Sequence, residues 1–191
     1  SFAAHVNFTT GTEPRSLAMG DLDGDGKLDL ITANWQTNTM SVLRNTSNAG
    51  VIDAGTFAPK FDFVTGSQPS GVACGDLDGD GKLDLVVANY VSNNISVFRN
   101  TAISGSIGAS SFAAKVDFTV GASAIYPAIG DLDGDGKPEL AVVNNLSNVS
   151  IFRNTTTVGS ITSASFAAKV DFSAGIGASP QCVAMGDLDG N

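Results

Sequence analysis

The sequence predicts an all-β fold, and specifically a segment of a β-propeller built from four-stranded blades that carry calcium loops. The decapeptide DLDGDGKLDL occupies residues 21–30, recurs at 76–85 and 131–140 with two changes in the last copy, and is cut short at 187–191. The copies start at 21, 76, 131 and 187, so the period is 55, 55 and 56 residues. A period of this size indicates a propeller or solenoid, and short strand-like segments at regular spacing favour the propeller.

Each repeat contains four strand-like segments in a fixed order. The first is short and apolar, and it is expected at residues 17–20, 72–75, 128–130 and 183–186. The acidic loop follows, and then comes an apolar run such as 83–88 that suits a strand buried on both faces. In the third segment apolar and polar residues alternate, with apolar residues at Ile95 and Val97. The fourth is rich in Phe (residues 1–8, 56–63, 111–118 and 165–172), which we expect to form the core between blades.

The acidic loops have the pattern of a calcium site. Each full copy places carboxylates at loop positions 1, 3, 5 and 9, with Gly at positions 4 and 6. Calcium takes six to eight oxygen ligands, and glycine permits the tight turns that bring such ligands together. An EF-hand is excluded, because position 12 is Thr or Val and a strand follows the loop. The alternative is a solvated acidic turn, but four carboxylates so close would repel one another without a cation.

The loops therefore predict Ca²⁺ as the cofactor, with three full sites and an incomplete fourth. The expected ligands are the side chains of Asp21, Asp23, Asp25 and Asp29 with the Lys27 carbonyl, those of Asp76, Asp78, Asp80 and Asp84 with the Lys82 carbonyl, those of Asp131, Asp133, Asp135 and Glu139 with the Lys137 carbonyl, and Asp187 and Asp189 in the incomplete loop.

These loops, the Gly-Asp pairs before them and the apolar strands after them resemble the FG-GAP/VCBS repeats, best known from the propellers of integrin α-subunits. The resemblance covers essentially the whole chain. It implies a calcium-binding propeller, usually of seven blades, that acts in adhesion and ligand binding. Here it predicts one incomplete propeller over residues 1–191, with repeats at about 1–55, 56–110 and 111–164 and a partial one at 165–191. Open blade edges of this kind also predict self-association.

Charge and composition limit the partners and the cellular location that we expect. The net charge of −9 argues against nucleic acid or an anionic membrane as a partner, and no apolar run is long enough to span a membrane. Of the 19 acidic residues, 14 lie in the four loops, so the acidity belongs to the metal sites. Because calcium is abundant outside cells, we expect an extracellular or cell-surface location, with the periplasm as the alternative. Cys74 and Cys182 are expected to be free and mostly buried.

Catalysis is not expected from this sequence. The single histidine, His5, stands where the other repeats have lysine, so we expect a surface residue and no catalytic triad. The candidate ligand-face residues are Trp35, Tyr90 and Tyr126, in loops at the blade ends opposite the acidic loops, and their alternative role is blade-to-blade packing. The ligand would be a protein or a glycan.

The predicted function is thus an extracellular calcium-stabilised propeller module for adhesion or ligand binding. Two alternatives stay open: a structural repeat that polymerises into a fibre or sheath, and an accessory domain of a secreted polysaccharide-active enzyme.

Overall fold

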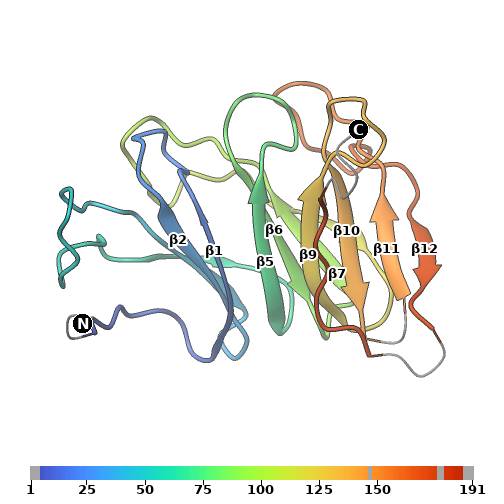
Figure 1. Cartoon of the computed structure of the whole chain (residues 1–191), viewed down its shortest axis with the longest axis horizontal. Coiled ribbons are helices and arrows are strands. Elements are labelled where there is room, and N and C mark those ends of the chain that lie inside the picture. Colours follow the sequence, from blue (N-terminus) through green and yellow to red (C-terminus); the bar gives the residue numbers. More distant parts are fainter. Residues whose placement is uncertain (1–4, 146–147, 176–178, 187–191) are drawn as a thin grey trace.

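The computed structural model describes residues 5–145, 148–175 and 179–186. These residues form three four-stranded antiparallel sheets, one for each full repeat, and contain no helix (Figure 1). Among them, accordingly, no helix has the length and the apolar run that crossing a membrane requires. The predicted all-β architecture of four-stranded repeats is confirmed.

The strands of each sheet are neighbours in the order of the chain. The first sheet contains β1 (Pro14–Gly20), β2 (Asp29–Asn34), β3 (Thr39–Leu43) and β4 (Phe61–Val64). The second contains β5 (Pro69–Gly75), β6 (Asp84–Asn89), β7 (Asn94–Phe98) and β8 (Val116–Thr119). The third contains β9 (Ala124–Gly130), β10 (Glu139–Asn144), β11 (Asn148–Phe152) and β12 (Val170–Ser173). The acidic loops join the first and second strands of each sheet.

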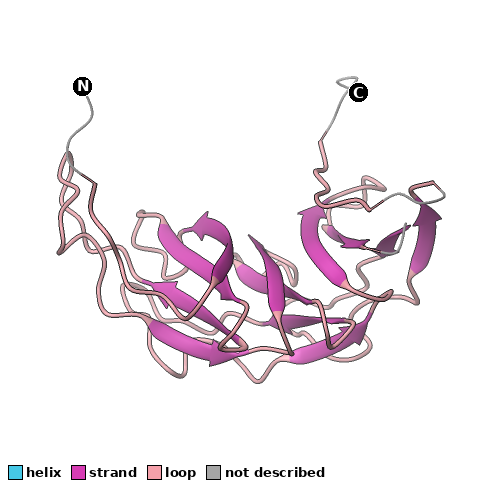
Figure 2. Ribbon diagram, turned by 90° about the horizontal axis from the view of Figure 1, so that it is seen from below, coloured by secondary structure: helices cyan, strands magenta, loops and turns pink. Residues whose placement is uncertain are grey.

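The sheets pack face to face in succession, and Figure 2 shows them following one another along an arc. The inner strands β1, β5 and β9 lie side by side. One apolar core lies between the first and second sheets, around Met40, Val42 and Leu85, and another lies between the second and third, around Ile95 and Val142. Strands β6 and β10 are buried along their whole length, as the continuous apolar runs predict.

The fourth strands are shorter than the Phe pattern predicts. Strand β8 begins at Val116, whereas Phe112 lies before it and forms an isolated bridge with Asn100. Phe118 packs edge-on against Phe166 with ring centroids 5.1 Å apart, so these rings do form core between blades. Phe172, at the same position of the third sheet, is 57% exposed, because no described sheet covers that face.

Residues 183–186, which are expected to form the first strand of a fourth repeat, also differ from the prediction. Residues 183–186 are not a strand, although Met185 lies against β9 and would sit 3.3 Å from a Cβ at Gly130. Inner strands in the three sheets pair with the second strand of their own unit, and no described residues supply that partner here. Both cysteines are free, but Cys182 is exposed, so the expectation of a buried thiol is wrong there, whereas Cys74 is half-buried.

Candidate metal centre

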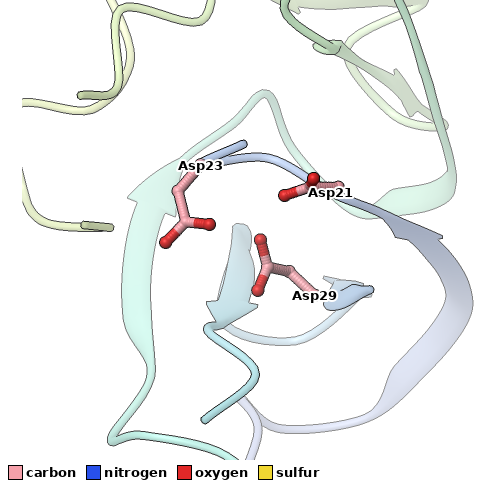
Figure 3. Close-up of side chains that lie close together, drawn as sticks. All are labelled: Asp21, Asp23 and Asp29. Atoms are coloured by element: carbon pink, nitrogen blue, oxygen red, sulfur yellow. The ribbon is translucent and has the colours of Figure 1, made fainter. Parts of the chain in front are cut away.

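Three carboxylates of each acidic loop converge on one point. In the first loop, Asp21 and Asp23 come from the turn after β1 and Asp29 is the first residue of β2, and their nearest oxygens all lie within 4.8 Å of one another. Figure 3 shows the three groups facing a common space. The same positions converge in the other two repeats: Asp76, Asp78 and Asp84, and Asp131, Asp133 and Glu139. Gly24 and Gly26 turn the loop with φ of +68° and +85°, a region that side chains disfavour.

Backbone amides hold these carboxylates in place. Asp29 is fully buried, and its two oxygens accept hydrogen bonds from the backbone N–H groups of Leu22 (3.0 Å) and Asn45 (2.8 Å). Asp21 accepts from Asp25 N–H (3.1 Å) and Gly26 N–H (2.8 Å), so the loop wraps around its own first carboxylate. The group of three is therefore built into the fold, with two carboxylates on the loop and one on the buried strand.

The electrostatics of the group favour a bound cation. Asp23 Oδ1 is buried and has no hydrogen-bond partner among the described residues. A buried carboxylate oxygen without a partner is costly, and a metal ion is the partner that three converging carboxylates suit. Burial raises the pKa of Asp29 to about 6 and that of Asp84 to about 7, because the charged carboxylate loses its water. The residues thus fit a hard divalent cation bound by oxygen.

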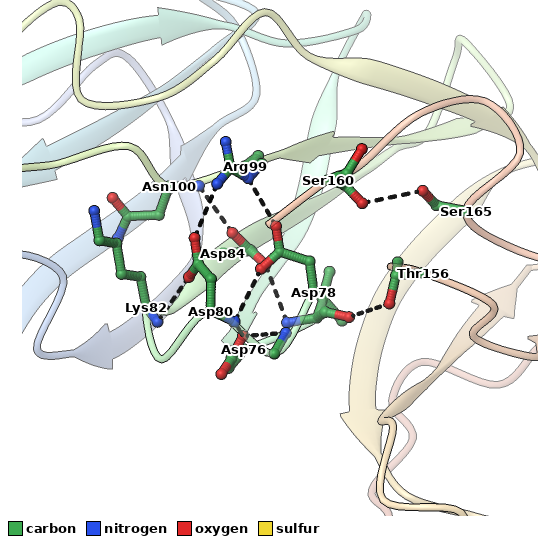
Figure 4. A network of polar contacts seen from close by, with 12 residues as sticks. Asp76, Asp78, Asp80, Lys82, Asp84, Arg99, Asn100, Thr156, Ser160 and Ser165 are labelled. Carbon is green, nitrogen blue, oxygen red and sulfur yellow. Dashed lines mark hydrogen bonds and ion pairs between the residues drawn. The ribbon is translucent and has the colours of Figure 1, made fainter. Parts of the chain in front are cut away.

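The carboxylate at loop position 5 lies outside these groups of three. Asp25 pairs with Arg44 Nη2 at 2.9 Å, while Arg44 Nε donates to Asp23. Arg99 does the same in the second repeat, at 2.7 Å from Asp78 and 3.0 Å from Asp80 (Figure 4). Sequence reasoning missed these arginines, although each stands in the RNT motif that recurs in every repeat. In the third repeat the contact is looser, with Arg153 at 3.5 Å from Asp133.

The other predicted ligands do not belong to the groups of three found in the described residues. Asp80 and Asp135, like Asp25, are not in the groups of three. The carbonyls of Lys27, Lys82 and Lys137 stay a prediction, and the Lys82 side chain turns away to donate to the Ala102 carbonyl at 2.8 Å. Asp187 and Asp189 lie outside the described residues.

The first two acidic loops are covered by the following repeat. Asn100 Nδ2 donates to the Leu22 carbonyl at 2.8 Å, and Gly105 N–H donates to the Asp23 carbonyl at 3.0 Å. Asn154 Nδ2 and Gly159 N–H make the equivalent bonds to the second loop (2.9 and 3.2 Å). The third loop has no such cover among the described residues: Leu132 is 51% exposed, whereas its counterpart Leu77 is 1% exposed.

The predicted ligand-face residues lie at the other end of the sheets. Trp35 and Tyr90 directly follow β2 and β6, whose first residues Asp29 and Asp84 belong to the groups of three, so each strand separates the two faces. The backbone N–H of Trp35 donates to the Glu13 carbonyl and that of Tyr90 to the Gln68 carbonyl, both at 3.0 Å. Asn145 makes the same 3.0 Å bond to Ser123 in the third repeat. One backbone geometry therefore presents a different side chain from each repeat.

These side chains line a cleft of about 480 Å³ that crosses all three repeats. Its lining residues are Arg15, Trp35, Ser70, Tyr90, Ile125, Tyr126, Asn145 and Gln181. The Trp35 and Tyr90 rings are 5.3 Å apart between centroids, and Asn145 Nδ2 donates to the Tyr90 hydroxyl at 3.3 Å. The structure thus brings the predicted Trp35, Tyr90 and Tyr126 together. The Trp35–Tyr90 contact also joins the first two repeats, as the packing alternative predicts.

Comparison with known proteins adds one match. A family model described as FG-GAP-like repeat matches residues 21–87, 76–142 and 131–191. No curated protein matches the chain. Each match begins at an acidic loop, at residue 21, 76 or 131, so the matches follow the period of the repeat seen in the structure.

Proposed function

The chain belongs to the FG-GAP-like repeat family, and from this premise we propose that it is a calcium-stabilised β-propeller-like module for adhesion or ligand binding outside the cell. The observation that carries the calcium proposal is the Asp23 carboxylate, which converges with two further carboxylates and whose buried Oδ1 has no hydrogen-bond partner among the described residues. We propose no enzymatic role, since the carboxylates with raised pKa belong to the metal groups.

Calcium suits these loops better than the other common divalent ions. The converging donors are carboxylate oxygens, which hard cations prefer, and no Cys or His belongs to any of the three groups found in the described residues. Calcium tolerates an irregular ring of six to eight oxygens, whereas magnesium demands a near-ideal octahedron and keeps several waters. A bound ion would tie the turn at Asp21 and Asp23 to the buried start of β2. In the first two repeats it would thereby stabilise the acidic loop that the following repeat covers.

An extracellular setting would supply the calcium that these sites need. Structural sites of modest affinity fill only where free calcium is high, as it is outside cells. The 14 carboxylates in the four loops account for most of the acidic residues, so bound calcium would remove much of the net charge of −9. The face opposite the metal groups, with its cleft, is then the surface on which a ligand would be recognised.

The pH dependence of stability tests the proposal. We expect the gap in melting temperature between calcium and chelator to widen as pH rises from about 5 to about 7.5. Without calcium, folded Asp29 and Asp84 keep protons up to pH about 6 and 7, while the unfolded carboxyls ionise near pH 4. The unfolded state then binds fewer protons in this window, so these two groups make the calcium-free fold less stable as pH rises.

With calcium this loss of stability disappears, because the ion competes with protons for the same oxygens and keeps the folded carboxylates ionised. Scanning calorimetry in matched calcium and chelator buffers at four or five pH values measures the gap. Asp29→Asn and Asp84→Asn together should flatten its pH dependence, since neither amide titrates. A gap that stays constant across this range would contradict the assignment of these buried carboxylates as ligands.

A further inference from the structure

We propose that the cleft between Trp35, Tyr90 and Tyr126 binds a neutral oligosaccharide. This inference rests on the proposed function in one respect only, namely that the face opposite the metal groups is the ligand face. It names the class of ligand and the residues that would hold it. Four features of the structure support it: a repeated backbone geometry, side chains in the cleft that differ from repeat to repeat, the chemistry of the lining, and a second hollow that shares Trp35 with the cleft.

The backbone under the cleft is rigid. Glu13, Gln68 and Ser123 adopt left-handed φ values of 59°, 55° and 61°, which non-glycine residues adopt only when their surroundings hold them there. Side-chain oxygens of the preceding repeat brace two of them: Asn38 Oδ1 accepts from Gln68 N–H and Asn93 Oδ1 accepts from Ser123 N–H, both at 2.7 Å. These bonds cross from one repeat to the next, so they fix the spacing between the cleft residues.

The side chains that line the cleft differ from repeat to repeat, although the scaffold beneath them is the same. Just beneath it, the same buried pair recurs in each sheet, with an Asn amide donating to a Ser hydroxyl at 2.8–2.9 Å: Asn34 and Ser41, Asn89 and Ser96, and Asn144 and Ser150. The next position along the chain is Trp35, Tyr90 or Asn145. The position at the start of the inner strand is Arg15, Ser70 or Ile125. At this end of the sheets the buried Asn–Ser pair is thus constant while the cleft positions above it differ, which is the pattern of a recognition surface.

The chemistry of the lining suits a saccharide. Tyr90 and Tyr126 present aromatic surface, on which the C–H face of a sugar ring can stack, while Asn145 and Gln181 supply planar amides for neighbouring hydroxyls. The one charged group, Arg15, is already neutralised by Glu13 at 2.6 Å and lies over the Trp35 ring at 3.6 Å from its centroid. The cleft therefore offers no free charge to an acidic ligand, and an uncharged, hydroxyl-rich one matches it.

The cleft continues beyond Trp35. A second hollow of about 380 Å³ is lined by Trp35, Gln36, Asn38, Ser67, Gln68 and Val91. Trp35 separates the two hollows, and the second is again rich in amides and contains no charged residue. Each hollow has the size of a small-ligand site. An extended chain of several sugar units, lying across Trp35, fits this arrangement better than a single sugar does.

Trp35 provides a direct test, because it is the only tryptophan in the chain. The probes are five neutral oligosaccharides (the hexaoses of cellulose, xylan, mannan, amylose and chitin) and one acidic one, hexagalacturonate, titrated into the full chain in calcium. At least one neutral probe should shift the Trp35 emission along a saturating curve. Tyr126→Ala and Tyr90→Phe should each weaken that binding, Tyr126→Ala by about tenfold, the effect of losing about 1.4 kcal/mol of contact.

The matched control is Phe172→Ala, which removes an exposed aromatic ring from β12, away from the cleft. It should leave the affinity unchanged, and melting curves of all variants should show that each is folded. Tyr126→Phe keeps the ring if Tyr126→Ala fails to fold, and it should retain most of the binding. The inference fails if no neutral probe changes the emission at about 10 mM, if only the acidic probe binds, or if Phe172→Ala weakens binding as much as Tyr126→Ala. If no sugar binds but calcium still raises the melting temperature, this inference fails and the calcium proposal stands. If a neutral sugar binds but calcium has no effect on melting, the calcium proposal fails and this inference stands.

Discussion

Chelation of calcium is expected to lower the melting temperature of the chain by up to about 16–32 °C. An ion that binds only the folded state stabilises it by about 2.7 kcal/mol at one hundred times its dissociation constant. Three such sites would contribute up to about 8 kcal/mol, and each kcal/mol shifts the melting temperature of a domain of this size by about 2–4 °C. The physical source is the set of converging carboxylates, which repel one another once the ion has left.

The measurement is a thermal unfolding curve in calcium, in chelator, and in chelator followed by excess calcium. Magnesium in place of calcium should restore only a small part of the loss, because the loops offer an irregular ring of oxygens. Coincident curves with and without chelator would show that no ion at these loops contributes to stability.

Asn100→Ala is expected to cost about 2–4 kcal/mol of folding free energy. Its fully buried amide donates to the Leu83 carbonyl of its own repeat at 2.9 Å and to the Leu22 carbonyl of the preceding repeat at 2.8 Å. Its oxygen also accepts from Ala102 N–H at 2.8 Å. Alanine would leave the Leu22 carbonyl and the Ala102 N–H buried without these partners, and each orphaned group costs about 1–3 kcal/mol.

The matched control is Asn45→Ala in the first repeat. Asn45 makes the same bonds within its own repeat, to the Leu28 carbonyl and from Ser47 N–H, both at 2.9 Å. It is half-buried, and no bond to a preceding repeat is recorded for it among the described residues. Chemical denaturation should therefore show a cost of about 1 kcal/mol for Asn45→Ala. Equal costs for the two variants would mean that the bond from Asn100 to Leu22 does not couple the first two repeats.

The sequence was enough to predict the repeat unit and the converging carboxylates. Carboxylates at alternate loop positions, with glycines between them, leave few ways to fold the turn, and a following apolar run must become a buried strand. The loop alone predicts that Asp21, Asp23, Asp25 and Asp29 meet, and of these Asp21, Asp23 and Asp29 converge in the structure. It also separates the two faces, because Trp35 stands at the opposite end of the strand that Asp29 begins.

The pairing of Asp25 with Arg44 could not be predicted from the sequence in this way. The partners are 19 residues apart and meet only because β3 returns to the edge where the acidic loop lies. The positions of the Phe side chains depend on which faces neighbouring sheets cover, so Phe118 is buried while the equivalent Phe172 is exposed. Alternation along a strand predicts which side chains share a face, but it does not predict whether another sheet packs on that face.

The most direct test of the central claim is the number of calcium ions bound per chain, measured by equilibrium dialysis with radioactive calcium. The account predicts three ions, one for each group of converging carboxylates in the described residues, with the ion at the exposed third loop held most weakly. Asp23→Asn, Asp78→Asn and Asp133→Asn should each remove one ion. A chain that binds no calcium at about 1 mM free ion, or that keeps all three ions in these variants, would contradict the account.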